Sequence, residues 1–302
     1  MLNLAHIYFQ GTEAESSNAS TAIEAAGGLR VRFQPAPCSL VPPFGGGDSH
    51  DPLLTWVLRQ AGLNARAYRP RALERRLAAC LRQLGAPTRT AAREKLASRP
   101  ELVESVLNTV LIGVTDFFRD RAVWDQLAQQ TLPELLRTHR ALRVYAAGTS
   151  SGHELYSMAM LLAEAGALAH SDLCGLDCRP DAIAVARAGV FAEAALARVP
   201  AEWRERYFAP TWGGYQARPA LRSGLRWRVG DLFAFEELAA WDVILFRNVA
   251  IYLEENHAAR AWEYLCDQLS PGGVLVTGKA EKPPPHLPLR RIGPSLYQRL
   301  AE

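Results

Sequence analysis

Residues 143–157, RVYAAGTSSGHELYS, join a short apolar strand to a helix through a loop that contains two glycines. Arg143–Ala147 has the apolar run of a buried strand, and a helix is predicted over His153–Glu164. Gly148 and Gly152 permit a sharp turn and let the backbone approach a ligand. The spacing G-x-x-x-G lacks the third glycine of the dinucleotide fingerprint, which favours an uncharged nucleoside with an amino-acid tail over a diphosphate. A tight turn that binds no ligand remains the alternative.

Strands and helices alternate on the C-terminal side of this loop. Strands are predicted at Leu173–Leu176, Trp241–Phe246 and Val274–Thr277, and helices at 181–188 and 257–269. This rhythm predicts an α/β fold with a mostly parallel, doubly wound sheet covered by helices on both faces. Residues 200–231 interrupt the rhythm. Their short pieces Tyr215–Ala217 and Leu225–Val229 predict an insertion or a small antiparallel piece, which would form a small β-subdomain within about 200–230.

The chain between residues 51 and 110 has a helical pattern instead. One helix face carries Leu73, Leu77, Cys80, Leu81 and Leu84, whereas Arg71, Arg75 and Arg82 fall on another face. Gly85 is expected to end this helix, and further helices are predicted at 89–96 and 101–111.

Basic residues are concentrated in the same region. Residues 51–104 contain eleven Arg or Lys against five Asp or Glu, although the whole chain has a net charge of only +3. A basic helical module suggests an acidic partner, and an Arg-rich solvent-exposed surface is the alternative.

The first fifty residues differ from the rest in composition. They are rich in Ala, Ser, Gly and Pro without sustained periodicity, which predicts poor order. The string Tyr8-Phe9-Gln10-Gly11 resembles a tag-protease cleavage site, so we expect part of this segment to be a remnant of an expression tag. The expected layout is an extension at 1–50, a helical domain at 51–112, a linker and helix at 113–140, and an α/β domain at 141–302.

Composition excludes several classes of protein. No apolar run approaches the ~18–20 residues of a membrane span, and there is no signal-peptide pattern. Five dispersed cysteines without a C-x-x-C pair argue against a disulfide framework and against a metal site. We expect a cytoplasmic monomer that binds neither nucleic acid nor metal and inserts nothing into a membrane.

Polar residues follow the predicted strands at their carboxyl ends, where open α/β sheets bind ligands. Asp177 ends the second strand and can accept hydrogen bonds from both ribose hydroxyls, although a solvated acid is an equal alternative. Glu154 can pair with an ammonium group or can simply complement the helix dipole. Arg247 and Asn248 follow the strand at 241–246, and Tyr252 lies near Asn248 if a helical turn begins there.

Several strings together resemble the CheR family of chemotaxis receptor methyltransferases. They are residues 114–120 (VTDFFRD), 147–160 (AGTSSGHELYSMAM), Asp231-Leu232, 246–253 (FRNVAIYL) and 271–281 (PGGVLVTGKAE). They stand in the family's order and spacing, and the resemblance covers roughly residues 52–300. It implies a small helical domain joined to an α/β domain that binds S-adenosylmethionine. It also implies methyl transfer to glutamate carboxylates on receptor cytoplasmic helices, which gives methyl esters and S-adenosylhomocysteine.

The resemblance also implies roles for individual residues. Arg119, Asn248 and Tyr252 would position the substrate carboxylate in the active site. The arginines at 71, 75 and 82 would face the acidic receptor helix. The cofactor would be bound by Thr115, Arg119, Gly148, Gly152, Glu154, Asp177, Asp231, Leu232 and Asn248.

Two positions depart from the family pattern at the cofactor site. His153 replaces one of two adjacent carboxylates, and Arg179 replaces an acid shortly after Asp177. We expect His153 to be a surface residue at the helix N-terminus and not a catalytic base. These departures leave two alternatives open: a divergent, non-catalytic signalling module that binds S-adenosylmethionine or S-adenosylhomocysteine, and a methyltransferase for another acidic substrate.

Overall fold

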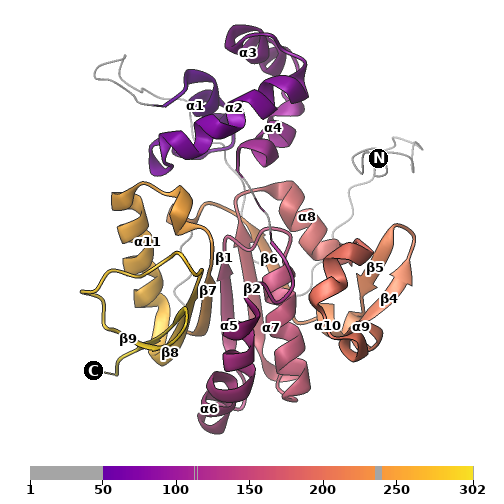
Figure 1. The fold of residues 1–302 in the computed structure, drawn as a ribbon, viewed down its shortest axis with the longest axis vertical. Helices are drawn as coiled ribbons and strands as arrows, with labels where there is room; N and C mark the ends of the chain where they lie inside the picture. The colour runs from indigo at the N-terminus through magenta and orange to yellow at the C-terminus, as the bar shows by residue number, and fades with distance from the viewer. Residues whose placement is uncertain (1–49, 112, 114, 235–239, 302) are drawn as a thin grey trace, which may run out of the picture. The chain divides into compact units, whose positions relative to one another are not determined.

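The computed structural model describes residues 50–111, 113, 115–234 and 240–301. Figure 1 shows a central sheet with helices packed along it, and a second, smaller sheet. The predicted N-terminal extension at 1–50 lies almost entirely outside the described residues. No helix in the described part of the chain is long and apolar enough to cross a membrane.

The N-terminal part of the described chain consists of helices with clear sequence signals. The Asp51 side chain caps the first helix by accepting hydrogen bonds from the N–H groups of Leu53 (2.9 Å) and Leu54 (3.2 Å). Gly85 ends the second helix in a left-handed conformation (φ 58°), as predicted. The four helices are α1 (Pro52–Gln60), α2 (Pro70–Leu84), α3 (Arg89–Ser98) and α4 (Leu102–Val110).

The predicted faces of α2 are confirmed. Leu73, Cys80 and Leu84 are buried in the core of the helical part, and Leu77 and Leu81 pack against it. The three predicted arginines, Arg71, Arg75 and Arg82, are exposed. The borders of the domains stay predictions.

The large sheet has seven strands in the order β6-β2-β1-β7-β8-β10-β9. The first five strands are parallel, and β10 runs antiparallel to both β8 and β9. This confirms the predicted α/β fold with a mostly parallel sheet, and the antiparallel β10 and β9 make the sheet mixed. The bounds are β1 (Arg143–Ala147), β2 (Asp172–Asp177), β6 (Leu225–Val229), β7 (Trp241–Phe246), β8 (Leu269–Thr277), β9 (Leu289–Gly293) and β10 (Leu296–Arg299).

Alternate residues of the central strands supply two cores on opposite faces of the sheet. In β1, Val144 and Ala146 join a cluster with residues of the helix α7 (His153–Glu164) such as Met158. Tyr145 joins a second cluster with Trp262 of the helix α11 (Glu255–Gln268). Because both faces are buried, the central strands are continuous apolar runs, which is why they could be found in the sequence.

The remaining helical elements connect and cover these strands. The α-helices are α5 (Arg121–Gln126), α6 (Leu132–Thr138), α7 (His153–Glu164), α8 (Pro180–Ala188), α9 (Ala201–Tyr207), α10 (Pro219–Arg222) and α11 (Glu255–Gln268). A π-helical turn, η3 (Leu127–Thr131), joins α5 to α6. The 3₁₀ turns are η2 (Ala65–Ala67), η4 (Leu168–His170), η5 (Glu193–Arg198), η6 (Leu232–Ala234) and η7 (Ala250–Tyr252).

The structure corrects the prediction for Leu225–Val229. This segment is β6, a parallel edge strand of the large sheet paired with β2, and it is not part of a small antiparallel piece. As an edge strand it alternates polar and apolar residues like an antiparallel strand, with Arg226 bound to Asp172 (2.7 Å). The small antiparallel sheet consists of β3 (Val190–Phe191), β5 (Gly214–Ala217) and β4 (Phe208–Thr211) in that order, so it begins before residue 200.

Candidate cofactor and active site

The carboxyl ends of four adjacent parallel strands supply polar residues to one edge of the sheet. In the sheet order β6, β2, β1 and β7, these strands are followed or ended by Asp231, Asp177, Gly148 and Asn248. The chain leaves β1 toward β2 and β6 on one side and later adds β7 and β8 on the other. This reversal at β1 is the topological switch point at which open α/β sheets bind ligands.

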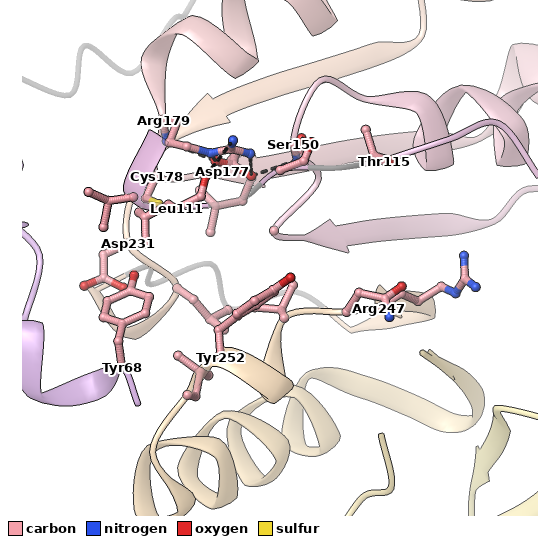
Figure 2. Close-up of a pocket in the computed structure, with 18 of the residues that line it drawn as sticks. Tyr68, Leu111, Thr115, Ser150, Asp177, Cys178, Arg179, Asp231, Arg247 and Tyr252 are labelled. Carbon is pink, nitrogen blue, oxygen red and sulfur yellow. Dashed lines mark hydrogen bonds and ion pairs between the residues drawn. The ribbon is translucent and has the colours of Figure 1, made fainter. Parts of the chain in front are cut away.

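A cavity of about 1060 Å³, open to solvent, lies at this edge. Figure 2 shows Ser150, Asp177 and Arg179 on one side and Tyr68 and Tyr252 on the other. Of the residues predicted for the site, those that line the cavity are Thr115, Arg119, Gly148, Glu154, Asp177, Asp231, Leu232, Asn248 and Tyr252. Gly152 does not line the cavity.

The two glycines of the loop therefore have different surroundings. Gly148 (φ 71°) lines the cavity, and a Cβ there would approach the Val249 side chain to 2.6 Å. Gly152 (φ 85°) precedes α7, and a Cβ there would meet the Trp227 ring at 2.7 Å. Gly148 brings backbone to the cavity, whereas Gly152 serves the packing of α7 against β6.

The helical part of the chain closes one side of the cavity through backbone contacts. The Arg69 N–H donates to the Tyr252 carbonyl (2.8 Å), and the Glu254 N–H donates to the Ala67 carbonyl (2.9 Å). These bonds hold Tyr68 and Tyr252 at the cavity. Tyr68 is a lining residue that sequence reasoning missed, because nothing local distinguishes it from a core aromatic. Burial, with nearby Cys178 and Asp231, raises the pKa of its hydroxyl well above its usual value.

Arg119 lies on a turn with unusual backbone geometry. Its neighbours Phe118 (φ 50°) and Asp120 (φ 62°) are both left-handed, which is costly for a bulky residue such as phenylalanine. A hydrogen bond helps to offset this cost, because the Phe118 N–H donates to the buried Ser157 hydroxyl (3.0 Å). Such conformations cluster at functional sites, and cavity residues Ser150 (φ 54°) and Asn248 (φ 59°) share them.

Glu154 belongs to a buried cluster of charges around Arg247. The Arg247 side chain is fully buried and donates to Glu154 through Nη1 and to Asp120 (2.8 Å) and the Arg119 carbonyl (3.0 Å) through Nη2. Burial raises the pKa of Glu154, while Arg247 and Arg119 oppose that rise. Arg247 thus connects the Glu154 carboxylate to the turn that bears Arg119.

Asn248 is held by a second buried acid, Glu281. The Glu281 carboxylate accepts hydrogen bonds from the N–H groups of Asn248 (2.6 Å), Gly278 (2.9 Å) and Ile251 (3.3 Å). The sequence signal was present, because Glu281 ends the family string at 271–281, but no role was assigned to it. Asn248 Oδ1 is buried and has no hydrogen-bond partner among the described residues, so it is available to a donor on a ligand.

Asp177 is buried and fully engaged. Its carboxylate accepts from the Ser150 N–H (2.7 Å) and forms an ion pair with Arg179 (3.0 Å from Nε). Asp231 has a simpler environment: it accepts from the Phe233 N–H (3.1 Å), and burial raises its pKa.

His153 differs from its predicted place at the surface. It is only 8% exposed, and its ring packs against those of Phe117 and Phe191, with centroids 4.7 Å away in each case. Burial lowers its pKa to about 4, with a smaller opposing effect of Asp116. A short helix-start sequence could not reveal this aromatic cluster, because Phe117 and Phe191 come from distant segments.

The cavity's donors and acceptors fit a nucleoside that carries an amino acid. Asp231 and Glu154 can accept from hydroxyl and amino groups, Asp177 can do so if the Arg179 guanidinium moves away, and the Asn248 Oδ1 adds a neutral acceptor. Gly148 lets the backbone approach the ligand. No run of backbone N–H groups with several glycines, as a diphosphate would need, is present in the loop at 148–152.

Comparisons with known proteins agree with this site. Residues 113–289 match the family model described as CheR methyltransferase, SAM binding domain. The chemotaxis protein methyltransferase of Listeria monocytogenes serovar 1/2a is 30% identical over 227 residues, which cover 75% of this chain and 87% of that protein. Chemotaxis protein methyltransferase 1 of Pseudomonas aeruginosa is 30% identical over 215 residues, covering 67% of this chain and 78% of that protein.

The solved structure of N-methyltransferase NodS from Bradyrhizobium japonicum WM9 with S-adenosyl-L-homocysteine is less similar to this chain. It has 20% identity and a TM-score of 0.31, and it covers 53% of this chain and 63% of that one. The match at 113–289 includes the strands β1 to β8, the glycine loop and most of the cavity described above. This chain belongs to the CheR methyltransferase family and carries the family's S-adenosylmethionine-binding domain.

Proposed function

We propose that this methyltransferase transfers methyl groups to glutamate side chains on the cytoplasmic helices of methyl-accepting chemotaxis receptors. The products are glutamyl methyl esters and S-adenosylhomocysteine. The observation that carries the proposal is the convergence of Arg119, Asn248 and Tyr252 on the cavity, beside the residues suited to the cofactor.

The chemistry requires little of the protein beyond positioning. S-adenosylmethionine, when bound, would supply a methyl group on its sulfonium sulfur: the carboxylate oxygen would bond to the methyl carbon as the carbon–sulfur bond breaks, and the sulfur would leave as the thioether of S-adenosylhomocysteine. A glutamate carboxylate is already ionised near pH 7, because its reference pKa is ~4.3, so no strong general base is needed. The chain's contribution is to align the carboxylate and to exclude water.

Arg119 is the residue that we assign to the acceptor carboxylate. A guanidinium can hold a carboxylate in a fixed orientation by paired hydrogen bonds. The left-handed residues on both sides of Arg119 and the bond from Arg247 to its carbonyl (3.0 Å) fix its backbone. Asn248, in the loop after β7, and Tyr252, in the turn η7, complete the positioning of the carboxylate.

The cofactor is assigned to the other residues of the cavity. Glu154 would bind the ammonium group of the methionine moiety, Asp177 the ribose, and Asp231 and Leu232 the adenine side. Thr115, in the linker before α5, and Gly148, in the glycine loop, would also contact the cofactor. Gly152 would influence cofactor binding only indirectly, through the packing of α7.

The receptor surface is assigned to helix α2. Arg71, Arg75 and Arg82 are exposed on it, and the region around them is strongly basic. A basic helix face complements an acidic receptor helix and would steer its approach. The enzyme would act as a monomer on this surface.

Transfer of labelled methyl groups to receptor-containing membranes tests the proposal. We expect alkali-labile label on the receptor, as for an ester, and loss of transfer in Arg119→Ala with nearly unchanged S-adenosylhomocysteine binding by calorimetry. The matched control is Arg121→Ala, because Arg121 is exposed and two residues away, and its guanidinium pairs with Asp125 (2.7 Å) and lies over the Phe118 ring (5.9 Å to the centroid).

The other outcomes each contradict the proposal in a distinct way. Cofactor binding without transfer to any receptor favours the non-catalytic module. Transfer to a different acidic protein or to a small acid rejects the receptor as substrate. Wild-type transfer by Arg119→Ala rejects the role assigned to that residue.

A further inference from the structure

Arg179 forms a buried ion pair inside the cofactor cavity. The guanidinium donates to Asp177 from Nε (3.0 Å to Oδ1) and from Nη2 (3.3 Å to Oδ2), and the Arg179 backbone N–H donates to Oδ1 as well (3.0 Å). The two side chains are 9% and 7% exposed. Dashed lines in Figure 2 mark this pair and the bond from Ser150.

These contacts use the whole hydrogen-bonding capacity of the Asp177 carboxylate. A carboxylate offers about four acceptor positions, two on each oxygen. Oδ1 accepts from the Arg179 N–H and from its Nε, and Oδ2 accepts from the Ser150 N–H and from Arg179 Nη2. A ribose diol that donates two hydrogen bonds to Asp177 must therefore displace the guanidinium.

The same guanidinium is anchored on its other side by the segment after α4. Its Nη1 donates to the Leu111 carbonyl (3.2 Å). A Cβ on Gly113 would lie 2.2 Å from Nη1, so only glycine leaves room there for the guanidinium. Ser150 also reaches this segment, since its hydroxyl donates to the Gly113 carbonyl (2.9 Å).

We infer that Arg179 competes with the cofactor ribose for Asp177 and so sets the affinity of this protein for S-adenosylmethionine and S-adenosylhomocysteine. In the state with the Arg179–Asp177 pair, the ribose site is closed by the chain's own side chain. The apparent dissociation constant equals the intrinsic one divided by the fraction of molecules without the pair. Cofactor binding moves the guanidinium away from Asp177. It thereby alters the hydrogen bond from Arg179 to the Leu111 carbonyl, in the segment that leads to Thr115.

This inference rests on the cofactor assigned to the cavity, and it does not require glutamate to be the methyl acceptor. Its test is a binding measurement, so a failure of methyl transfer leaves it unaffected. We expect Arg179→Met to lower the dissociation constant for S-adenosylhomocysteine by about tenfold or more in calorimetry, because a paired fraction above nine-tenths has that effect. Arg187→Ala is the matched control, since Arg187 is an exposed arginine in the last turn of α8, the helix that follows Arg179, and donates to the Trp227 carbonyl (3.3 Å).

An unchanged or higher dissociation constant in a folded Arg179→Met protein overturns the inference. The double variant Asp177→Asn with Arg179→Met adds a second criterion, because competition at Asp177 predicts that the gain in affinity shrinks in the Asp177→Asn background. An equal gain in both backgrounds contradicts competition at Asp177.

If the variants do not fold, a crystal structure of the wild-type protein with S-adenosylhomocysteine tests the competition directly. We expect the ribose hydroxyls on Asp177 and the Arg179 guanidinium outside hydrogen-bond distance of it. A bound ribose on Asp177 with the ion pair intact contradicts the inference.

Discussion

The Glu281 carboxylate accepts a 2.6 Å hydrogen bond from the backbone N–H of Asn248. Glu281 follows β8 and Asn248 follows β7, so a buried acid from one strand end fixes the loop at the neighbouring strand end. The bond matters because Asn248 has a left-handed backbone (φ 59°) that an asparagine tolerates but does not strongly prefer. Glu281 also accepts from Gly278 (2.9 Å), which ties the two loops together.

Replacing Glu281 tests its role in positioning Asn248. Glu281→Ala leaves buried N–H groups without an acceptor, so we expect a loss of about 2–3 kcal/mol in the free energy of unfolding, measured in denaturant. We also expect a fall in methyl transfer that exceeds the loss of cofactor affinity. Glu281→Gln keeps one acceptor oxygen and should recover part of both properties. If Glu281→Ala changed stability but left transfer per folded molecule unchanged, Glu281 would be purely structural.

The two loop glycines should respond differently to the same substitution. Gly148→Ala introduces a Cβ 2.6 Å from Val249 at the cavity, and Gly152→Ala introduces one 2.7 Å from Trp227 in the packing of α7. Both also pay for a positive φ. We expect Gly148→Ala to weaken S-adenosylhomocysteine binding more than it lowers the melting temperature, and Gly152→Ala to do the reverse. The same balance of effects in both variants would contradict the separate roles.

His153 should make the protein less stable in acid. Burial holds its folded-state pKa at about 4, whereas the unfolded chain takes up the proton near its ordinary pKa of 6.5. The unfolded state therefore binds more protons between these values, and stability is complete above about pH 6.5 and falls as the pH drops toward 4. Between pH 6.5 and 5 the free energy of unfolding should fall by about 2 kcal/mol because of His153.

The comparison that isolates His153 uses His153→Phe, which keeps an aromatic ring between Phe117 and Phe191. Free energies of unfolding of both proteins are measured from pH 7 to pH 5, and the wild type should lose about 2 kcal/mol more than the variant. Parallel losses in the two proteins would show that His153 is not the group responsible.

The arginines of α2 should affect binding of the receptor and not binding of the cofactor. Replacing Arg71, Arg75 and Arg82 together by Ala should raise the KM for receptor in membranes several-fold and reduce its dependence on salt, because the three charges act by exposed electrostatic attraction. Calorimetry with S-adenosylhomocysteine should give the wild-type dissociation constant. Replacement of Arg59, Arg93 and Arg99, exposed arginines of the helical part outside α2, is the charge-matched control. An equal effect of both triplets would show that general charge, and not the α2 face, attracts the receptor.

The central sheet was predictable because its strands are buried on both faces. Arg143–Ala147 and Trp241–Phe246 occur at their predicted bounds, and Gly85 ends α2 as expected. The same physics explains the one misplaced strand. Leu225–Val229 is exposed along one edge, so it lacks the continuous apolar run and alternates like a hairpin strand.

The site was predictable in part, since strand ends supply it and the strand ends could be located. Asp177, Asp231 and Asn248 follow this rule, and they line one cavity. Tyr68 and the burial of His153 could not be predicted, because both depend on contacts between segments far apart in the chain. Arg179 was visible as a departure from the family pattern, but its contact with the Leu111 carbonyl requires the fold.

Mapping of the methylated residue tests the central claim most directly. Receptor-containing membranes are incubated with the wild-type protein and labelled S-adenosylmethionine, and the receptor is then digested under mild acid and its peptides are sequenced by mass spectrometry. The account predicts methyl esters on glutamate side chains of the receptor's cytoplasmic helices, and none with Arg119→Ala. Label on lysine or another side chain, or no label on the receptor while the protein binds the cofactor, would contradict it.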